Sequence, residues 1–221
     1  MRKIPRLGTA GLLAAIAIGL TACGSPPPEI PPPSTQAEAP TQANTADGVT
    51  TSKQLFGAAC SQLPQGGVPG SPDRLASQPV VEGLNSNPFS KTFSTAIQKA
   101  GLVGALDEAP SVTVFVPYEA AFADLQQQLG PDKYNALLAD QKQLADILKY
   151  HVLVKRYDRA GLASARQVTT LQGGQLQVAD AGDTMNIQDN GKGTAHVLCG
   201  NVPTKNATVF FVDKVLMPIV P

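Results

Sequence analysis

The chain of 221 residues carries three cysteines and two histidines, residue types that often serve as nucleophiles, bases or metal ligands. They are Cys23, Cys60, Cys199, His151 and His196. A structural zinc site needs about four nitrogen or sulfur ligands, so this set leaves little room for one. The sequence also lacks G-x-S-x-G, H-E-x-x-H, G-x-G-x-x-G and P-loop patterns. We therefore predict no catalytic residue, no metal and no cofactor, with an undetected serine hydrolase as the alternative.

Residues 1–22 have the pattern of an export signal. Arg2, Lys3 and Arg6 make a positive start, and an uninterrupted apolar run follows over residues 10–20. As a helix this run reaches about 16 Å, which is short of the ~30 Å apolar core of a bilayer. The pattern therefore favours a cleaved signal peptide over a membrane span.

The apolar run ends in Leu-Thr-Ala-Cys-Gly, which resembles the bacterial lipobox and places Cys23 at the cleavage site. This resemblance implies that the Cys23 thiol is acylated, and stable anchoring takes more than one acyl chain. We predict a protein that is lipid-anchored on the outer side of a bacterial cell membrane, with release from the cell as a second location. Ordinary secretion with Cys23 unmodified is the alternative.

Residues 23–51 differ in composition, and we interpret them as a disordered, proline-rich tether. The segment holds seven prolines, and Ile30 and Val49 are its only large apolar residues. Such a segment buries too little surface to offset the entropy of ordering, and it acts as a semi-rigid spacer. Without the signal peptide the chain keeps 14 basic and 17 acidic residues, a net charge of −3, which disfavours nucleic acid as a partner.

Residues 52–221 have the length of one domain, and helical patterns come first. Asn87-Pro88 predicts a helix start, because asparagine caps helices and proline fits their first turn. Phe93 and Ile97 then share one helical face, and Gly101 predicts the helix end. Further helical patterns are carried by Phe122, Leu125 and Leu129, by Leu137 and Leu138 after Pro131, and by Leu144, Ile147 and Leu148.

Strand patterns dominate the second half of this domain. Residues 111–116 are rich in β-branched side chains and end at Pro117, which cannot donate to a sheet. Residues 175–178 and 185–187 alternate apolar and polar side chains, and residues 208–212 are apolar on both faces, which predicts a central buried strand. Because helices and strands are segregated, we predict an α+β fold with N-terminal helices packed on a mostly antiparallel, β-rich C-terminal half.

Three segments of this domain resemble signatures of the fasciclin domain family. Residues 113–122 (TVFVPYEAAF) are similar to the opening signature, residues 206–218 (NATVFFVDKVLMP) to the closing segment, and Tyr150-His151 to the Tyr-His signature between them. The resemblance covers nearly all of residues 52–221 and implies a single fasciclin-like domain. The residues that carry it, here called the signature residues and expected to be structural, are Thr113, Phe115, Pro117, Phe122, Tyr150, His151, Asp213, Val215, Leu216 and Pro218.

His151 allows two interpretations. It lies on the apolar helical face of Leu144, Ile147 and Leu148, where a lone histidine is usually a hydrogen-bonded core residue. In some animal members of the family the Tyr-His region is associated with integrin binding, so a role in partner binding is the alternative. We expect the core role.

Cys60 and Cys199 are the thiols that remain once Cys23 is acylated. Two thiols in an exported protein normally pair, so we predict a Cys60–Cys199 disulfide. The lipobox, the proline-rich spacer and one cysteine near each end of the domain narrow the family resemblance to surface lipoprotein antigens of the mycobacterial type.

The order of anchor, spacer and domain, together with the resemblance, predicts a non-catalytic lipoprotein displayed at the cell surface. The resemblance implies adhesion or extracellular recognition of a host, matrix or envelope component. The expected partners are the membrane, through the acyl chains, and an unknown protein, matrix or envelope partner. The alternative function is a carrier of a small apolar ligand or lipid at the cell envelope.

Overall fold

The two central strands of the sheet are buried along their whole length. The computed structural model describes residues 47–190 and 193–219. In it β1 (Val112–Pro117) and β7 (Ala207–Val212) are parallel neighbours, with Val114 opposite Val209, and every residue of both strands is buried. The central, buried strand predicted over residues 208–212 is therefore confirmed.

The other strands pair antiparallel on either side of this central pair. The sheet order is β2-β1-β7-β6-β5-β4-β3. The outer strands are β2 (Val152–Leu153), β3 (Gln167–Thr169), β4 (Gln175–Asp180), β5 (Met185–Asp189) and β6 (Gly193–Pro203).

The two edges of the sheet meet each other. Leu153 of β2 forms an isolated antiparallel bridge with Thr170, which directly follows β3. The Leu171 N–H also donates to the Val152 carbonyl oxygen at 2.6 Å. The seven strands therefore curl until their first and last members touch, which covers backbone groups that an open sheet would expose.

Side chains of β1 and β7 alternate between two cores. Val114 and Val209 face the helices, where they join a core that includes Phe93 and is here called the helical core. Phe115 and Phe210 point the other way, into an inner core enclosed by the curled sheet. A strand that is apolar on both faces fits this position, because each face has a core of its own.

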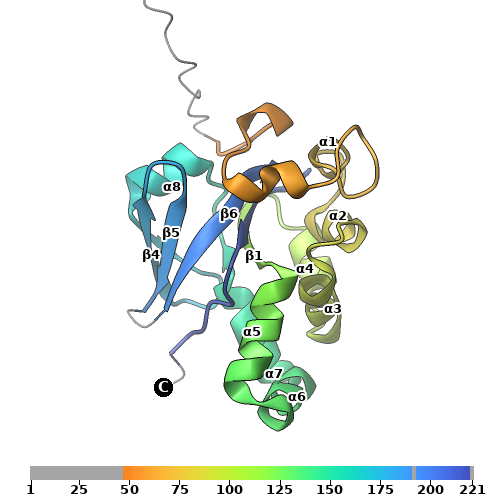
Figure 1. Cartoon of the computed structure of the whole chain (residues 1–221), viewed down its shortest axis with the longest axis vertical. Coiled ribbons are helices and arrows are strands. Elements are labelled where there is room, and N and C mark those ends of the chain that lie inside the picture. The colour runs from red at the N-terminus through yellow and green to blue at the C-terminus, as the bar shows by residue number, and fades with distance from the viewer. Residues whose placement is uncertain (1–46, 191–192, 220–221) are drawn as a thin grey trace, which may run out of the picture. The chain divides into compact units, whose positions relative to one another are not determined.

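The helices lie mainly on the outer side of the central strands. In Figure 1, α2, α3 and α4 lie on one side of β1 and β6, whereas β4, β5 and α8 lie on the other. This arrangement confirms the predicted α+β class. Within the described residues the helices are α1 (Pro72–Leu75), α2 (Val80–Ser86), α3 (Lys91–Lys99), α4 (Val103–Asp107), α5 (Glu119–Leu129), α6 (Pro131–Ala139), α7 (Gln141–Tyr150) and α8 (Arg159–Ala165), with short 3₁₀ helices at Ser52–Gln54 and Ala58–Gln62.

The predicted helix start at Asn87-Pro88 is wrong by three residues, because α3 begins at Lys91. The Asn87 side chain instead builds a turn, since its Oδ1 accepts the Phe89 N–H at 2.9 Å and its Nδ2 donates to the Gly70 carbonyl at 2.8 Å. Asparagine caps turns and helices by the same kind of bond, so the sequence alone does not distinguish them. The predicted end is correct, with Gly101 at a φ of 69°.

The signal peptide, Cys23 and most of the proposed tether lie outside the described residues. Two residues assigned to that tether, Gly48 and Thr50, are buried in the structure. The Thr208 hydroxyl donates to the Gly48 carbonyl at 2.7 Å, so the packed chain reaches back at least to this residue. No helix in the part of the chain that the structure describes has both the length and the apolarity to cross a membrane.

Candidate functional site

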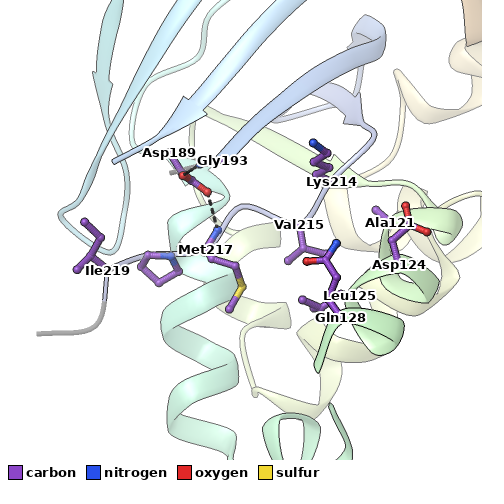
Figure 2. A pocket seen from close by; sticks show the side chains of 11 residues that line it. Ala121, Asp124, Leu125, Gln128, Asp189, Gly193, Lys214, Val215, Met217 and Ile219 are labelled. Carbon is purple, nitrogen blue, oxygen red and sulfur yellow. Dashed lines mark hydrogen bonds between the residues drawn. The ribbon is translucent and has the colours of Figure 1, made fainter. Parts of the chain in front are cut away.

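A cleft of about 490 Å³ lies between α5, the end of β5 and the C-terminal segment 214–219. Leu125 and Gln128 of α5 lie on one side, and Val215 and Met217 of the C-terminal segment lie opposite (Figure 2). Charged side chains of both signs, among them that of Lys214, also line it. Such a mixture of apolar and charged groups suits recognition of a polar surface feature more than storage of a hydrocarbon.

Two side chains hold the C-terminal segment in place. The Leu216 N–H donates to Nε2 of His151 at 2.9 Å. The Met217 N–H donates to Oδ2 of Asp189 at 3.3 Å, the bond drawn in Figure 2. Oδ1 of the same carboxylate accepts the Gly193 N–H at 2.6 Å. Both carboxylate oxygens of Asp189 therefore accept backbone hydrogen bonds that hold the wall of the cleft together.

His151 is completely buried, and its two bonds define its protonation state. Because Nε2 must accept the Leu216 N–H, the ring proton resides on Nδ1, which donates to the Ile147 carbonyl at 2.8 Å. Burial lowers the pKa of His151 to about 4, since the charged imidazolium would lose its hydration. The imidazole is therefore neutral at physiological pH and acts as a link between α7 and the C-terminal segment.

Tyr150 is also completely buried and belongs to the inner core, whereas His151 stacks edge-on against Phe93 of the helical core. The Tyr150 hydroxyl donates to the Gln175 carbonyl at 3.0 Å and accepts the Asn190 N–H at 3.3 Å. Burial raises the pKa of Tyr150. These two consecutive residues therefore pack in different cores, and neither side chain is exposed for contact with a partner.

A small apolar cavity lies behind the cleft, and Leu125 and Val215 line both spaces. Its lining comes from α3, α5, α6 and α7, and its volume is about 20 Å³. Pockets that bind drug-sized ligands typically measure about 300–1,000 Å³. A lipid would enter only if the surrounding helices separated, so the carrier function stays a prediction that this arrangement does not favour.

His196 and Asp213 form an exposed pair between β6 and the segment after β7. Nδ1 of His196 lies 2.9 Å from Oδ2 of Asp213, and the His196 N–H donates to Oδ1 at 2.7 Å. A serine hydrolase would add a hydroxyl bonded to the other ring nitrogen. Among the described residues no hydroxyl or thiol hydrogen-bonds to that nitrogen, and no cluster of three metal-ligating side chains occurs.

A model of the fasciclin domain matches residues 88–218. This chain belongs to the fasciclin domain family. The cell surface glycolipoproteins MPB83 of Mycobacterium bovis and MPT83 of Mycobacterium tuberculosis are each 34% identical to it, over 95% of this chain and 94% of theirs. The immunogenic protein MPB70 of Mycobacterium bovis is 32% identical over 74% of this chain and 82% of its own.

A solved fasciclin structure supports the fold. A domain pair from the insect cell adhesion molecule fasciclin I superposes with a TM-score of 0.57 at 16% identity. The superposition covers 65% of this chain and 51% of that one, so this chain spans about half of the pair. At this level of identity the likeness concerns the fold alone.

The opening fasciclin signature builds the start of the domain's framework. The Thr113 hydroxyl donates to the Lys155 carbonyl and accepts the Tyr157 N–H, both at 2.8 Å, which shapes the segment after β2. Phe115 enters the inner core, and Phe122 enters the helical core. Pro117 is the last residue of β1, and α5 begins two residues later, as predicted.

The closing signature builds the C-terminal segment. Asp213 bonds His196, and Leu216 is buried in the inner core at 1% exposure. Val215 packs against the helical core, and Pro218 lines the cleft. Val215 and Pro218 are thus the closing-signature residues that line the cleft, and His151 holds their segment in place through the Leu216 N–H.

The Cys60–Cys199 disulfide is present in the structure, with an S–S distance of 2.01 Å and a Cα–Cα distance of 4.8 Å. It joins the second 3₁₀ helix to β6 across 139 residues of sequence. Closing a loop of this size stabilises a fold by about 4–5 kcal/mol on chain-entropy grounds. The bond therefore ties the N-terminal part of the domain to the centre of the sheet.

Sequence reasoning missed two buried polar residues that organise the turn before β7. Nδ2 of Asn206 donates to the carbonyls of Leu106 and Ala109, and its Oδ1 accepts the Val80 N–H at 3.0 Å. The Arg156 guanidinium donates to the Ala207 carbonyl at 2.7 Å and to neighbouring carbonyls.

Burial lowers the pKa of Arg156, while the charge of Asp47 opposes that shift. Both missed residues bind backbone atoms contributed by distant segments. No local pattern in the sequence marks such contacts.

Proposed function

We propose that this chain is a non-enzymatic recognition domain, held on the outer face of a bacterial cell membrane by acyl chains on Cys23. Its fasciclin domain binds a host, matrix or envelope component while the proline-rich segment keeps it clear of the membrane. Part of the protein is released from the cell. The observation that carries this proposal is the 34% identity to cell surface glycolipoproteins over 95% of the chain.

The extent of that similarity supports the proposed anchor. The fasciclin model matches residues 88–218 alone, whereas the alignment with the surface glycolipoproteins covers almost the whole chain. The similarity therefore includes much of the N-terminal region as well as the domain. A lipobox and a spacer have little use in a protein that stays inside the cell.

The described residues also support contact over catalysis. The Tyr-His signature is buried and hydrogen-bonded, Asp189 is engaged by backbone N–H groups, and the His196 ring is paired with Asp213. Because the sheet edges meet, strand addition to an open edge is an unfavourable mode of binding. Recognition would then use side chains on exposed faces.

The anchor is tested by producing the full chain and its Cys23→Ser variant in a bacterial host that processes lipoproteins. We expect the wild-type chain in the membrane fraction, accessible to protease added to intact cells, and the variant in the medium. A Ser25→Ala variant, which leaves the cysteine in place, should behave as the wild type. Equal partitioning of the wild-type chain and the Cys23→Ser variant would overturn the lipid anchor.

Recognition is tested with the Cys23→Ser chain recovered from the medium, which carries no acyl chains. We expect saturable binding to at least one of three preparations: cell envelopes, extracellular matrix and intact host cells. The reduced and alkylated chain serves as the unfolded control. Absence of saturable binding to all three preparations would overturn the recognition role.

A further inference from the structure

The outer face of β4, β5 and β6 differs from an ordinary solvent-facing sheet surface. Cross-strand pairing places Gln177 opposite Gln188, and Gln188 opposite Thr194, in one row. Neighbouring strands lie about 4.8 Å apart, so the row presents a regular series of polar side chains. With Asn186 and Arg166, these residues line a recess of about 330 Å³. The charged side chain in its lining is that of Arg166.

Arg166 has a backbone conformation that arginine rarely adopts. Its φ is 56° and its ψ is −30°, directly after α8. By strand alternation Arg166 would share the side of Val168, which is buried in the inner core. The positive φ breaks that alternation, and the side chain is exposed instead.

The positive φ belongs to the turn that ends α8, where the Arg166 N–H donates to the Leu162 carbonyl at 3.1 Å and the Arg166 carbonyl accepts the Val178 N–H at 2.7 Å. The other described non-glycine residue with positive φ is Asn201. Asparagine tolerates that region, and Asn201 uses its side chain to bind the Arg159 N–H and the Gln54 carbonyl. The Arg166 guanidinium makes no hydrogen bond or ion pair with any described residue. The turn at the end of α8 therefore leaves a guanidinium without a described partner in the lining of the recess.

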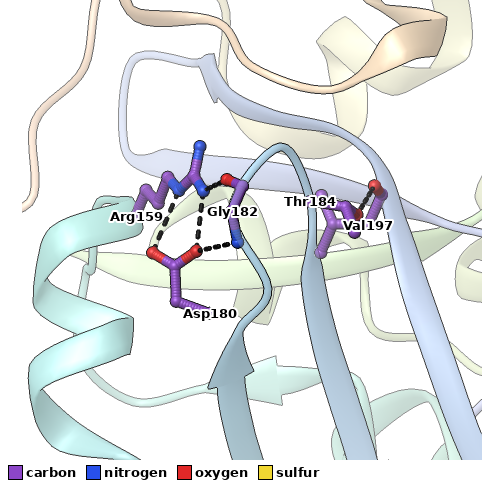
Figure 3. A network of polar contacts seen from close by, with 5 residues as sticks. All are labelled: Arg159, Asp180, Gly182, Thr184 and Val197. Atoms are coloured by element: carbon purple, nitrogen blue, oxygen red, sulfur yellow. Dashed lines mark hydrogen bonds and ion pairs between the residues drawn. The ribbon is translucent and has the colours of Figure 1, made fainter.

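The neighbouring structure holds this face rigid. The Arg159 guanidinium at the start of α8 donates to both carboxylate oxygens of Asp180, at 2.7 and 3.3 Å (Figure 3). These bonds lower the pKa of Asp180. The Thr184 hydroxyl donates to the Val197 carbonyl at 2.8 Å and ties β5 to β6. Arg166 therefore extends from a helix that is fixed at its other end, and preorganisation of this kind favours binding.

We propose that this face binds a polysaccharide that carries carboxylates, such as a uronate polymer. This inference rests on the proposed recognition role and assigns it a ligand chemistry. The Arg166 guanidinium pairs with a carboxylate through two parallel bonds. The amides of Gln177 and Gln188 donate and accept, as vicinal hydroxyls require. The Asn186 side chain lines the same recess, and its oxygen has no hydrogen-bond partner among the described residues.

A protein partner fits this face less well. Protein interfaces usually have a core of aromatic or large apolar side chains, and the exposed side chains of this recess are amides, a hydroxyl, an alanine and one guanidinium. A single cation also falls short of what a nucleic acid backbone requires. A linear acidic glycan lying across the strands can place hydroxyls along the polar row and one carboxylate at Arg166.

The test is binding of the full-length Cys23→Ser chain to alginate, with dextran as the uncharged polymer and polyglutamate as the non-sugar polyanion. We expect saturable binding to alginate alone. Arg166→Gly should weaken this binding at least tenfold and raise the Tm, because glycine accepts the positive φ without strain. Arg166→Lys should weaken it less, since the charge remains but the paired geometry is lost.

Matched controls separate this site from general charge effects. Arg74→Gln removes an exposed arginine elsewhere and should leave alginate binding unchanged. Gln177→Ala with Gln188→Ala should weaken alginate binding severalfold at an unchanged Tm. Equal binding of alginate by wild type and Arg166→Gly would overturn the site, and equal binding of polyglutamate and alginate would overturn the glycan assignment. If the wild-type chain binds envelopes but not alginate, this inference fails and the proposed function stands; if it binds none of the preparations, both fail.

Discussion

Around Tyr150 and His151 the polar atoms are hydrogen-bonded inside the protein, whereas on the outer face of β4 and β5 the Arg166 guanidinium remains free of described partners. The first region carries the family signature and is completely buried. The second carries none of the signature residues and is exposed. The signature residues therefore stabilise the fold. We expect partner selection to depend on exposed residues outside the signature.

This comparison predicts that changes in the buried framework lower stability, whereas changes on the outer face alter binding. The largest effect is expected from Cys60→Ser combined with Cys199→Ser. Loss of the 139-residue loop closure should lower the free energy of unfolding by about 4–5 kcal/mol. Urea unfolding followed by circular dichroism measures it, with Cys23→Ser as the control. A loss below about 1 kcal/mol would contradict the assigned role.

His151→Ala should lower the free energy of unfolding by about 3–4 kcal/mol, because it opens a cavity beside Phe93 and leaves the Leu216 N–H without its acceptor. Thermal unfolding measures the change. His196→Ala removes an exposed ring and should have little effect. An unchanged Tm together with lost partner binding would instead favour a direct role of His151 in recognition.

Acid should destabilise the protein through the same residue. The unfolded chain protonates His151 near pH 6.5, and the folded chain does so only near the lowered pKa of about 4. Between these values the unfolded state binds more protons, so stability present above pH 6.5 is lost as the pH falls, by up to about 3 kcal/mol. Urea unfolding from pH 7 to pH 4 measures it. His151→Gln should flatten this dependence, and an identical slope in the variant would assign the effect to other groups.

The smallest effect on stability is expected on the outer face. Gln177→Lys changes an exposed side chain that contributes nothing to either core, so the free energy of unfolding should change by no more than about 0.5 kcal/mol. Thermal unfolding and alginate binding measured on the same preparation sharpen the comparison. A large loss of stability in Gln177→Lys would show that the outer face of β4, β5 and β6 contributes to the stability of the fold.

The strands of the sheet were predictable where their periodicity is strong. Residues 208–212 and 111–116 are recognisable because burial on both faces favours β-branched and aromatic side chains along the strand. The start of α3 was misplaced because the Asn87 side chain makes the same kind of bond in a turn as at a helix start. Of the residues around the cleft, His151 and Leu216 were recognisable from the signature. Asp189 was not, because its partners are backbone N–H groups of Gly193 and of the more distant Met217.

The amino-acid sequence alone determined the class of the fold, the central strands and the family, since these depend on patterns a few residues long. Only the tertiary structure decided that Tyr150 and His151 serve opposite cores, that Asn206 and Arg156 bind distant backbone carbonyls, and that Arg166 leaves the inner side of the sheet. The reason is physical. Apolar periodicity is set by neighbouring residues, whereas the partner of a buried polar group is set by whichever segment the packing brings within hydrogen-bonding distance.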